Sequence, residues 1–302
     1  MCGPAENPAP RRKVRGRIKK NRIFFMVNVL FCGNDKVYDG ILTSVLSILK
    51  RTETKEPFRF FIFTMDLRDL KETYAPITER HARFLLQVVR GCNPENDVRL
   101  VDVTALYDEH FRSCPNEGCY TSPFTLIRLF ADLVPDMPEK FLYLDADVLA
   151  NRDVMLLYDT DVSRVEYAAA NDHYGKYFIN PRYINAGVML FNMTLCRTTG
   201  LFAKARALIQ THKLVFADQS AIIRSTTKKK LLPQKFNDQK FLHKHTVFRH
   251  FSQRLFYLPY PHIDNVKQWE VSRVHKIFRY FQFDDILLEY VYLIEKFRRD
   301  FL

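Results

Sequence analysis

The chain has 302 residues, of which 47% are hydrophobic, and carries a formal net charge of +12. This length and apolar content indicate a globular protein with one large domain, or one with a small appendage, and no stretch reaches the roughly 18 to 20 apolar residues of a membrane span. Six cysteines are scattered without a CxxC pair and no secretory signal pattern begins the chain, so we expect reduced thiols and a cytoplasmic protein.

The first 22 residues form a basic segment, with eight lysines and arginines between positions 11 and 22. We expect residues 1–22 to be either a solvated, disordered tail or a contact for an anionic surface. No motif of a nucleic-acid-binding module follows, so nucleic acid is the least favoured partner.

From residue 23 onward, strand-like and helix-like segments alternate. We expect strands at 23–31, 58–65 and 98–103 and helices at 40–50 and 77–90. A further helix is predicted at 122–135, with Ser122 as N-cap, Pro123 at its first position and Pro135 beyond its end. The alternation predicts an α/β domain with a mostly parallel sheet over residues 23–270.

Residues 271–302 are expected to form a helical C-terminal extension. In "FDDILLEYVYLIEKFRRDFL", Ile286, Tyr290 and Phe297 share an apolar helical stripe, with Asp285 and Glu289 on the opposite side. The partner of this stripe can be the α/β domain, a second subunit or a membrane surface. Together with the basic segment, it leads us to predict weak, peripheral association with the inner face of the cytoplasmic membrane.

Two carboxylates interrupt the buried strand expected in "FLYLDADVLA". Asp145 and Asp147 are two residues apart, so in an extended segment they project to the same side and repel each other unless a cation lies between them. Paired carboxylates supply hard oxygen ligands for Mg²⁺ or Mn²⁺. Their position at a strand end is where open α/β sheets bind ligands.

Five further segments accompany this motif in order: "YINAGVMLFNM" at 183–193, "FADQSAI" at 216–222, "LPQKFND" at 232–238, "FRHFS" at 248–252 and "KQW" at 267–269. Over residues 24–270 the chain therefore resembles glycosyltransferase family 8. The resemblance implies the GT-A fold, a single Rossmann-like nucleotide-sugar-binding domain. It also implies a hexosyltransferase that moves glucose or galactose from a UDP-sugar to a glycan or lipid-linked acceptor, with retention and with Mn²⁺, or alternatively Mg²⁺, as cofactor.

The same resemblance assigns expected roles to individual residues. The metal ligands are Asp145, Asp147 and His250. The residues expected to bind the nucleotide sugar are Cys32, Gly33, Asn34, Asp35, Arg128, Asp145, Ala146, Asn185, Ala186, Gly187 and Lys267. Those expected at the reacting face are Gln219, Asp218 and Asp172. Because the amide of Gln219 is a poor nucleophile, we favour front-face transfer over a covalent intermediate.

Three departures from the family pattern affect the expected nucleotide contacts. Asn34 stands where an aspartate is common, Gln253 replaces a glycine, and an insert at 254–266 precedes Lys267. They leave open an alternative, a catalytically inactive sugar-nucleotide-binding or scaffold protein. A metal-dependent phosphotransferase or nucleotidyltransferase is less favoured, since the sequence has neither a GxxxxGK[ST] loop nor a second acidic cluster.

Overall fold

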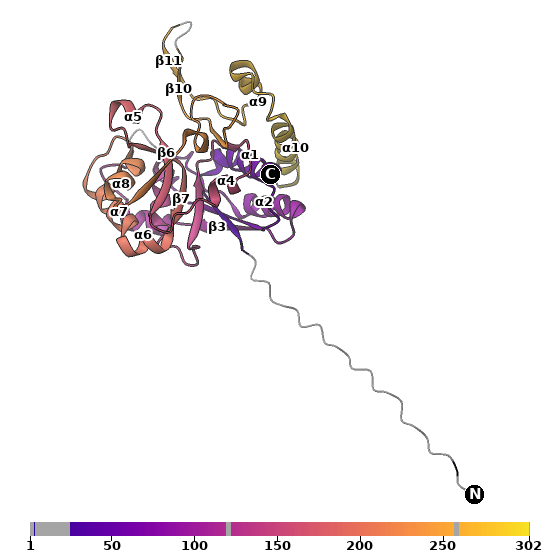
Figure 1. Cartoon of the computed structure of the whole chain (residues 1–302), viewed down its shortest axis with the longest axis horizontal. Helices are drawn as coiled ribbons and strands as arrows, with labels where there is room; N and C mark the ends of the chain where they lie inside the picture. Colours follow the sequence, from indigo (N-terminus) through magenta and orange to yellow (C-terminus); the bar gives the residue numbers. More distant parts are fainter. Residues whose placement is uncertain (1–2, 4–24, 119–121, 257–259, 302) are drawn as a thin grey trace.

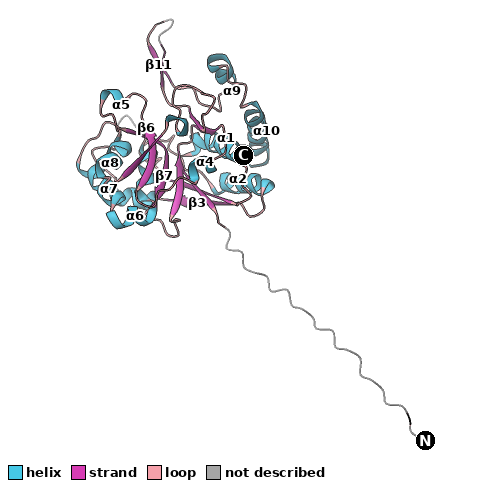
Figure 2. Cartoon of the chain, in the orientation of Figure 1, coloured by secondary structure: helices cyan, strands magenta, loops and turns pink. Residues whose placement is uncertain are grey.

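A seven-stranded sheet runs through the centre of the protein in the order β3-β2-β1-β4-β7-β6-β8 (Figure 1, Figure 2). The computed structural model describes residues 3, 25–118, 122–256 and 260–301. The strands are β1 (Val27–Cys32), β2 (Phe58–Thr64), β3 (Asp97–Asp102), β4 (Lys140–Leu144), β6 (Tyr167–Asn171), β7 (Ile184–Asn192) and β8 (Lys229–Leu232). Among the described strands of this sheet, only the pairs that β7 forms with β4 and β6 are antiparallel. The mixed, mostly parallel sheet expected from the sequence is therefore confirmed.

Helices cover both faces of this sheet, which gives the three layers of an α/β domain (Figure 2). Alternate residues of β1 enter two separate cores: Val27, Val29 and Phe31 face one, whereas Leu30 and Cys32 face the other. One face packs against α1 (Tyr38–Arg51), α2 (Glu79–Cys92), α4 (Met155–Tyr158) and α10 (Asp284–Phe301). The other packs against α3 (Thr104–His110), η2 (Pro123–Phe130), α6 (Met193–Thr199), α7 (Leu201–Thr211) and α8 (Ala217–Ser225). Burial on both faces explains why the central strands read as continuous apolar runs.

The helix expected at 122–135 is present but shorter, and it is a 3₁₀ helix. The Ser122 hydroxyl accepts a hydrogen bond from the Phe124 N–H, and Pro123 occupies the first position, as the sequence indicates. The helical bonds span three residues, for example from the Thr125 N–H to the Ser122 carbonyl at 3.1 Å. This tighter helix is buried along most of its length and holds Arg128 beside Asp145, just beyond the end of β4.

The insert at 254–266, before Lys267, contains two paired strands. Strands β10 (Arg254–Phe256) and β11 (His262–Asp264) pair antiparallel and project from the body of the protein (Figure 1). A short α9 (Val271–Arg273), the π-helical η4 (Val274–Phe278) and α10 follow. The remaining elements are the 3₁₀ helices η1 (Asp35–Val37) and η3 (Gln234–Phe236), the helix α5 (Gly175–Phe178) and the paired strands β5 (Val148–Ala150) and β9 (Phe248–His250).

The apolar stripe of α10 packs on the α/β domain. Ile286 is fully buried, and Phe297 is 2% exposed, within the core that α1 and α2 share. On the polar side, Glu289 pairs with Lys50 at 2.6 Å and Asp285 with Arg51 at 2.7 Å, both from α1. The stripe is therefore occupied by this domain. The basic segment 1–22 lies outside the described residues, and none of the described helices is long and apolar enough to cross a bilayer.

Candidate active site

The two aspartates lie in the turn between β4 and β5, and β9 brings a histidine beside them. Val148 of β5 pairs with His250 of β9, and the Phe251 N–H donates to the Asp147 carbonyl at 2.8 Å. His250 Nε2 lies 3.1 Å from Asp147 Oδ1 and 3.8 Å from Asp145 Oδ2. The three potential ligand atoms all lie within 4.8 Å of one another. Two carboxylates and an imidazole of this kind suit a divalent cation.

Two neighbours fix the side chains of this cluster. A Cβ at Gly187 would lie 2.4 Å from His250 Cε1 and 2.8 Å from Asp145 Oδ2, so only glycine leaves both side chains in place. Asn237 Oδ1 lies 3.1 Å from His250 Nδ1, and the Asn237 amide nitrogen donates to Asn185. This orientation makes His250 Nδ1 a hydrogen-bond donor to Asn237 and turns Nε2 toward the two carboxylates.

Arg128 lies behind the carboxylates and holds the first of them in position. Its guanidinium bonds the Ala186 carbonyl at 2.6 Å, Asp145 Oδ1 at 3.0 Å and Asp218 Oδ2 at 3.2 Å. The Tyr143 hydroxyl donates to the same Asp145 oxygen at 2.7 Å, and the Tyr143 ring lies 3.8 Å below the guanidinium. Burial alone would lower the pKa of Arg128, but Tyr143, Asp218 and Asp145 outweigh burial and raise it. With Oδ1 occupied in this way, Oδ2 of Asp145 faces His250.

The "KQW" segment places a lysine on the second aspartate in spite of the insert. Gln268 donates to the carbonyl of Ala146 at 2.7 Å, and Trp269 packs so closely on Gly40 of α1 that a Cβ there would lie 2.4 Å from its ring. These anchors direct the Lys267 ammonium to Asp147 Oδ2. Burial would raise the pKa of Asp147, but Lys267 and His250 hold it well below its usual range. Asp147 is therefore ionised at neutral pH.

A chain of amide hydrogen bonds connects the metal cluster to a second carboxylate site. Asn237, which contacts His250, donates to Asn185 Oδ1 at 2.8 Å, and Asn185 Nδ2 donates to Asp172 Oδ2 at 2.9 Å. The other oxygen of Asp172 accepts the Gly175 N–H at 2.7 Å and the Tyr174 N–H at 3.1 Å. Both oxygens of Asp172 are thus fixed by hydrogen bonds.

Asp218 and Gln219 are neighbours on α8 but face different environments. Asp218 is buried against Arg128, and its burial raises its pKa. The Gln219 side-chain oxygen accepts the Ala186 N–H at 2.9 Å, and its side chain lines the adjoining cavity. Of this pair, Gln219 is the residue that a ligand in the cavity can reach.

One cavity of about 610 Å³ joins these parts, which is a volume suited to a small-molecule substrate. Its lining includes Asp145, Asp147, Asp172, Asn185, Gln219, His250 and Lys267. Five other residues expected at the site support this lining from behind through the contacts above: Arg128, Ala146, Ala186, Gly187 and Asp218. Sequence reasoning did not single out Asn237, although it lies within the quoted "LPQKFND" segment, nor Lys240, which also lines the cavity.

Four of the residues expected to bind the nucleotide sugar lie at the carboxyl end of β1, beside β4 in the sheet: Cys32, Gly33, Asn34 and Asp35. Cys32 is buried near Arg128 and Asp145, and burial raises the pKa of its thiol. Asn34 donates to the Thr73 carbonyl at 3.2 Å. Among the described residues nothing bonds the buried Asp35 Oδ1, which leaves an acceptor available. Gly33 is required here, because a Cβ would lie 2.3 Å from Val37.

Comparisons with known proteins agree with this architecture. Similar solved structures include the apo bifunctional glycosyltransferase WbbM, at 16% identity and a TM-score of 0.67 over 92% of this chain and 52% of that one. The galactosyltransferase LgtC, solved with donor and acceptor sugar analogs, matches at 18% identity and a TM-score of 0.58 over 87% of this chain and 96% of that one. GlyE of Streptococcus pneumoniae TIGR4 matches at 18% identity and a TM-score of 0.53 over 88% of this chain and 63% of that one.

At these identities the similar structures show the fold alone, and the chain spans about half the length of WbbM. No curated protein matches this chain at a significant level. The model of the family described as "Glycosyl transferase family 8", however, matches residues 28–243, which is most of the chain. The chain is therefore a glycosyltransferase and belongs to glycosyl transferase family 8.

Proposed function

We propose that this protein transfers a hexose, glucose or galactose, from a UDP-sugar to a saccharide acceptor with a divalent cation, preferably Mn²⁺. The observation that carries the proposal is the cluster of Asp145, Asp147 and His250 at one wall of the cavity. The LgtC structure contains donor and acceptor sugar analogs, which supports the same two substrate classes here.

Asp145, Asp147 and His250 would hold the cation through one oxygen each from the aspartates and through His250 Nε2. A cation bound there supplies Lewis-acid stabilisation of negative charge on a leaving diphosphate. Lys267, which lies at Asp147, adds a second positive charge on the same side of the cavity. The protein's main contribution to the reaction is thus positioning and electrostatics.

The hydrogen bonds of the acidic residues favour front-face transfer with retention. A covalent intermediate needs a free nucleophile, but Asp218 is buried against Arg128 and both oxygens of Asp172 accept hydrogen bonds. Gln219 lines the cavity but is a neutral amide. We therefore propose that Asp172, Asn185 and Gln219 orient the donor sugar, and that the leaving phosphate accepts the proton of the acceptor hydroxyl.

The mouth of the cavity suits an acceptor with an apolar surface. Phe178, Ile179 and Phe216 line it and are 83%, 55% and 40% exposed. Such side chains can stack on sugar rings or contact the apolar part of a lipid-linked glycan. The acceptor that we propose is accordingly a glycan, free or lipid-linked.

The test is release of UDP from a panel of UDP-sugars, measured with Mn²⁺, with Mg²⁺ and after chelation. We expect turnover of UDP-glucose or UDP-galactose that requires the cation and is abolished in Asp147→Ala. Cation-independent turnover, or full activity in Asp147→Ala, would refute the proposed site. Gln219→Ala should reduce turnover more than donor affinity, because the amide faces the reacting sugar.

A further inference from the structure

We propose that Lys240, which lies outside the family's diphosphate motif, is a second cation that binds the donor's diphosphate. This inference rests on the proposed function and deepens it. It concerns the region around Gln253, which stands where the family pattern has glycine.

Lys240 has the placement of a ligand-binding cation. It is only 5% exposed, yet its side chain lines the same cavity as Asp147, His250 and Lys267. Its ammonium donates to the Gln253 carbonyl and lies 4.7 Å from the centre of the Tyr174 ring. It forms no ion pair within the described part of the chain, so a buried charge here lacks an anionic partner.

The contact with Gln253 places Lys240 on the wall that carries the metal cluster. Gln253 follows His250 by three residues, and the Ser252 hydroxyl between them donates to the Gln239 carbonyl at 3.3 Å. The ammonium therefore reaches the backbone just beyond the metal ligand, the region where the family pattern has glycine. Lys267 approaches from the other side of the cluster, at Asp147.

The charges around the cavity fit the same interpretation. Its lining contains three cations, Lys240, Arg254 and Lys267, and three carboxylates, Asp145, Asp147 and Asp172. A divalent cation bound to the cluster would leave the lining with two positive charges in excess. A nucleotide-sugar diphosphate carries about two negative charges at neutral pH, so it balances this excess.

The lowered pKa of Lys240 means that a bound anion would increase the fraction of Lys240 that is protonated. Burial lowers its pKa to about 8, and Arg249 and Arg254 act in the same direction, whereas Asp172 opposes them. A phosphate at hydrogen-bond distance would restore the charged form and supply the missing partner.

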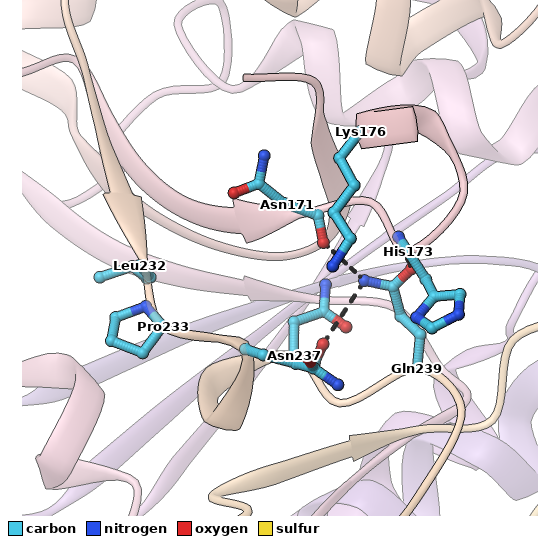
Figure 3. A pocket seen from close by; sticks show the side chains of 8 residues that line it. Asn171, His173, Lys176, Leu232, Pro233, Asn237 and Gln239 are labelled. Atoms are coloured by element: carbon cyan, nitrogen blue, oxygen red, sulfur yellow. Dashed lines mark hydrogen bonds between the residues drawn. The ribbon is translucent and has the colours of Figure 1, made fainter. Parts of the chain in front are cut away.

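A second lysine in the neighbouring cavity provides a matched control. Gln239 separates the active-site cavity from a smaller one of about 270 Å³, accepting the His173 N–H and donating to the Asn171 carbonyl, both at 2.9 Å (Figure 3). Lys176 extends into that smaller cavity (Figure 3). Like Lys240, it lies over a tyrosine ring, with its ammonium 4.8 Å from the centre of the Tyr177 ring. It does not line the active-site cavity.

The experiment measures binding of UDP, uridine and UDP-glucuronic acid to the full chain with Mn²⁺ by calorimetry. We expect Lys240→Met to weaken UDP binding roughly 10- to 100-fold, the loss typical of one charge-assisted hydrogen bond, while uridine binding stays unchanged. The UDP affinity of Lys240→Arg should stay within a few-fold of that of the unmodified chain. Lys176→Met should bind UDP as tightly as the unmodified chain does. Mn²⁺ binding without nucleotide and thermal unfolding verify that each variant is folded. If Lys240→Met does not fold, Lys240→Gln takes its place.

Three results would overturn the inference. Equal UDP affinity in the unmodified chain and Lys240→Met would remove Lys240 from the diphosphate site while leaving the proposed function intact. Normal UDP binding with a selective loss of UDP-glucuronic acid binding would assign Lys240 to an acidic sugar instead. Failure of the unmodified chain to bind UDP with Mn²⁺ would refute both the proposed function and this role.

Discussion

Gly187→Ala is the smallest change that should disable the metal cluster. The added methyl group would lie 2.4 Å from His250 Cε1, 2.8 Å from His250 Nδ1 and 2.8 Å from Asp145 Oδ2. Gly187 belongs to β7, whose pairing with β4 fixes its backbone, and its carbonyl accepts the Asp145 N–H at 2.8 Å. Because the backbone cannot easily retreat, the imidazole and the carboxylate must move.

The size of this movement sets the expected loss. An ordinary contact of a Cβ begins at 3.4 Å, so the histidine ring would have to move by roughly 1 Å. Metal–ligand bonds tolerate errors of only about 0.2 Å. Loss of ligand orientation typically lowers metal affinity by about 10- to 100-fold, and we expect at least this effect for Mn²⁺.

The assay is Mn²⁺ titration by electron paramagnetic resonance, which reports metal binding without any substrate. Gly91→Ala is the control, because a Cβ there meets nothing within 4 Å and Gly91 lies in α2. It should leave Mn²⁺ affinity unchanged and raise the free energy of unfolding by up to about 1 kcal/mol. Unchanged Mn²⁺ affinity in a folded Gly187→Ala protein would show that these three side chains do not form the metal site.

Three further predictions concern buried charges. Arg128→Met should lower the free energy of unfolding in urea by about 3–5 kcal/mol because it leaves Asp218 buried and unpaired. Adding Asp218→Asn should recover part of that loss. An unaltered urea midpoint in Arg128→Met would contradict the pairing. Burial would raise the pKa of Glu166, but hydrogen bonds from residues such as Thr226 lower it, so its stabilising contribution is present above the unfolded pKa of about 4.3 and is lost as pH falls through the folded value. The stability difference between Glu166→Gln and the unmodified chain should therefore shrink as urea titrations move to acid pH, and a constant difference would refute this linkage. UDP affinity should fall as pH rises above about 8, where Lys240 of the ligand-free protein loses its proton. The same decline in a Lys240→Arg variant would show that another group titrates.

The parts of the fold that follow from local pattern were predictable from the sequence. Strands β1, β2 and β4 read as apolar runs because both faces are buried, and the paired aspartates end β4 as the motif indicates. The proximity of His250 was predictable only through the family resemblance. It depends on the pairing of β5 with β9, two three-residue strands about 100 positions apart, and no local signal fixes such a register.

Residues that act through hydrogen bonds were harder to predict than residues that line the cavity. Asp218 and Gln219 are adjacent in the sequence, and only the packing of α8 decides that the aspartate faces Arg128 while the amide faces the cavity. Asn237 acts through His250 and Asn185, which lie on different strands. This role depends on contacts among three segments, so no local sequence pattern predicts it.

The position of Lys267 shows why an insertion near a motif need not disturb the motif's geometry. Gln268 and Trp269 attach this segment to Ala146 and Gly40, so its place is set by those contacts and not by its distance in sequence from His250. The residues inserted before it leave the body as the β10–β11 hairpin (Figure 1). Arg254, Leu255 and Ile263 from that hairpin line the cavity. The hairpin thus adds two apolar side chains and one cation to the lining of the cavity, while Asp145, Asp147 and His250 lie outside the hairpin.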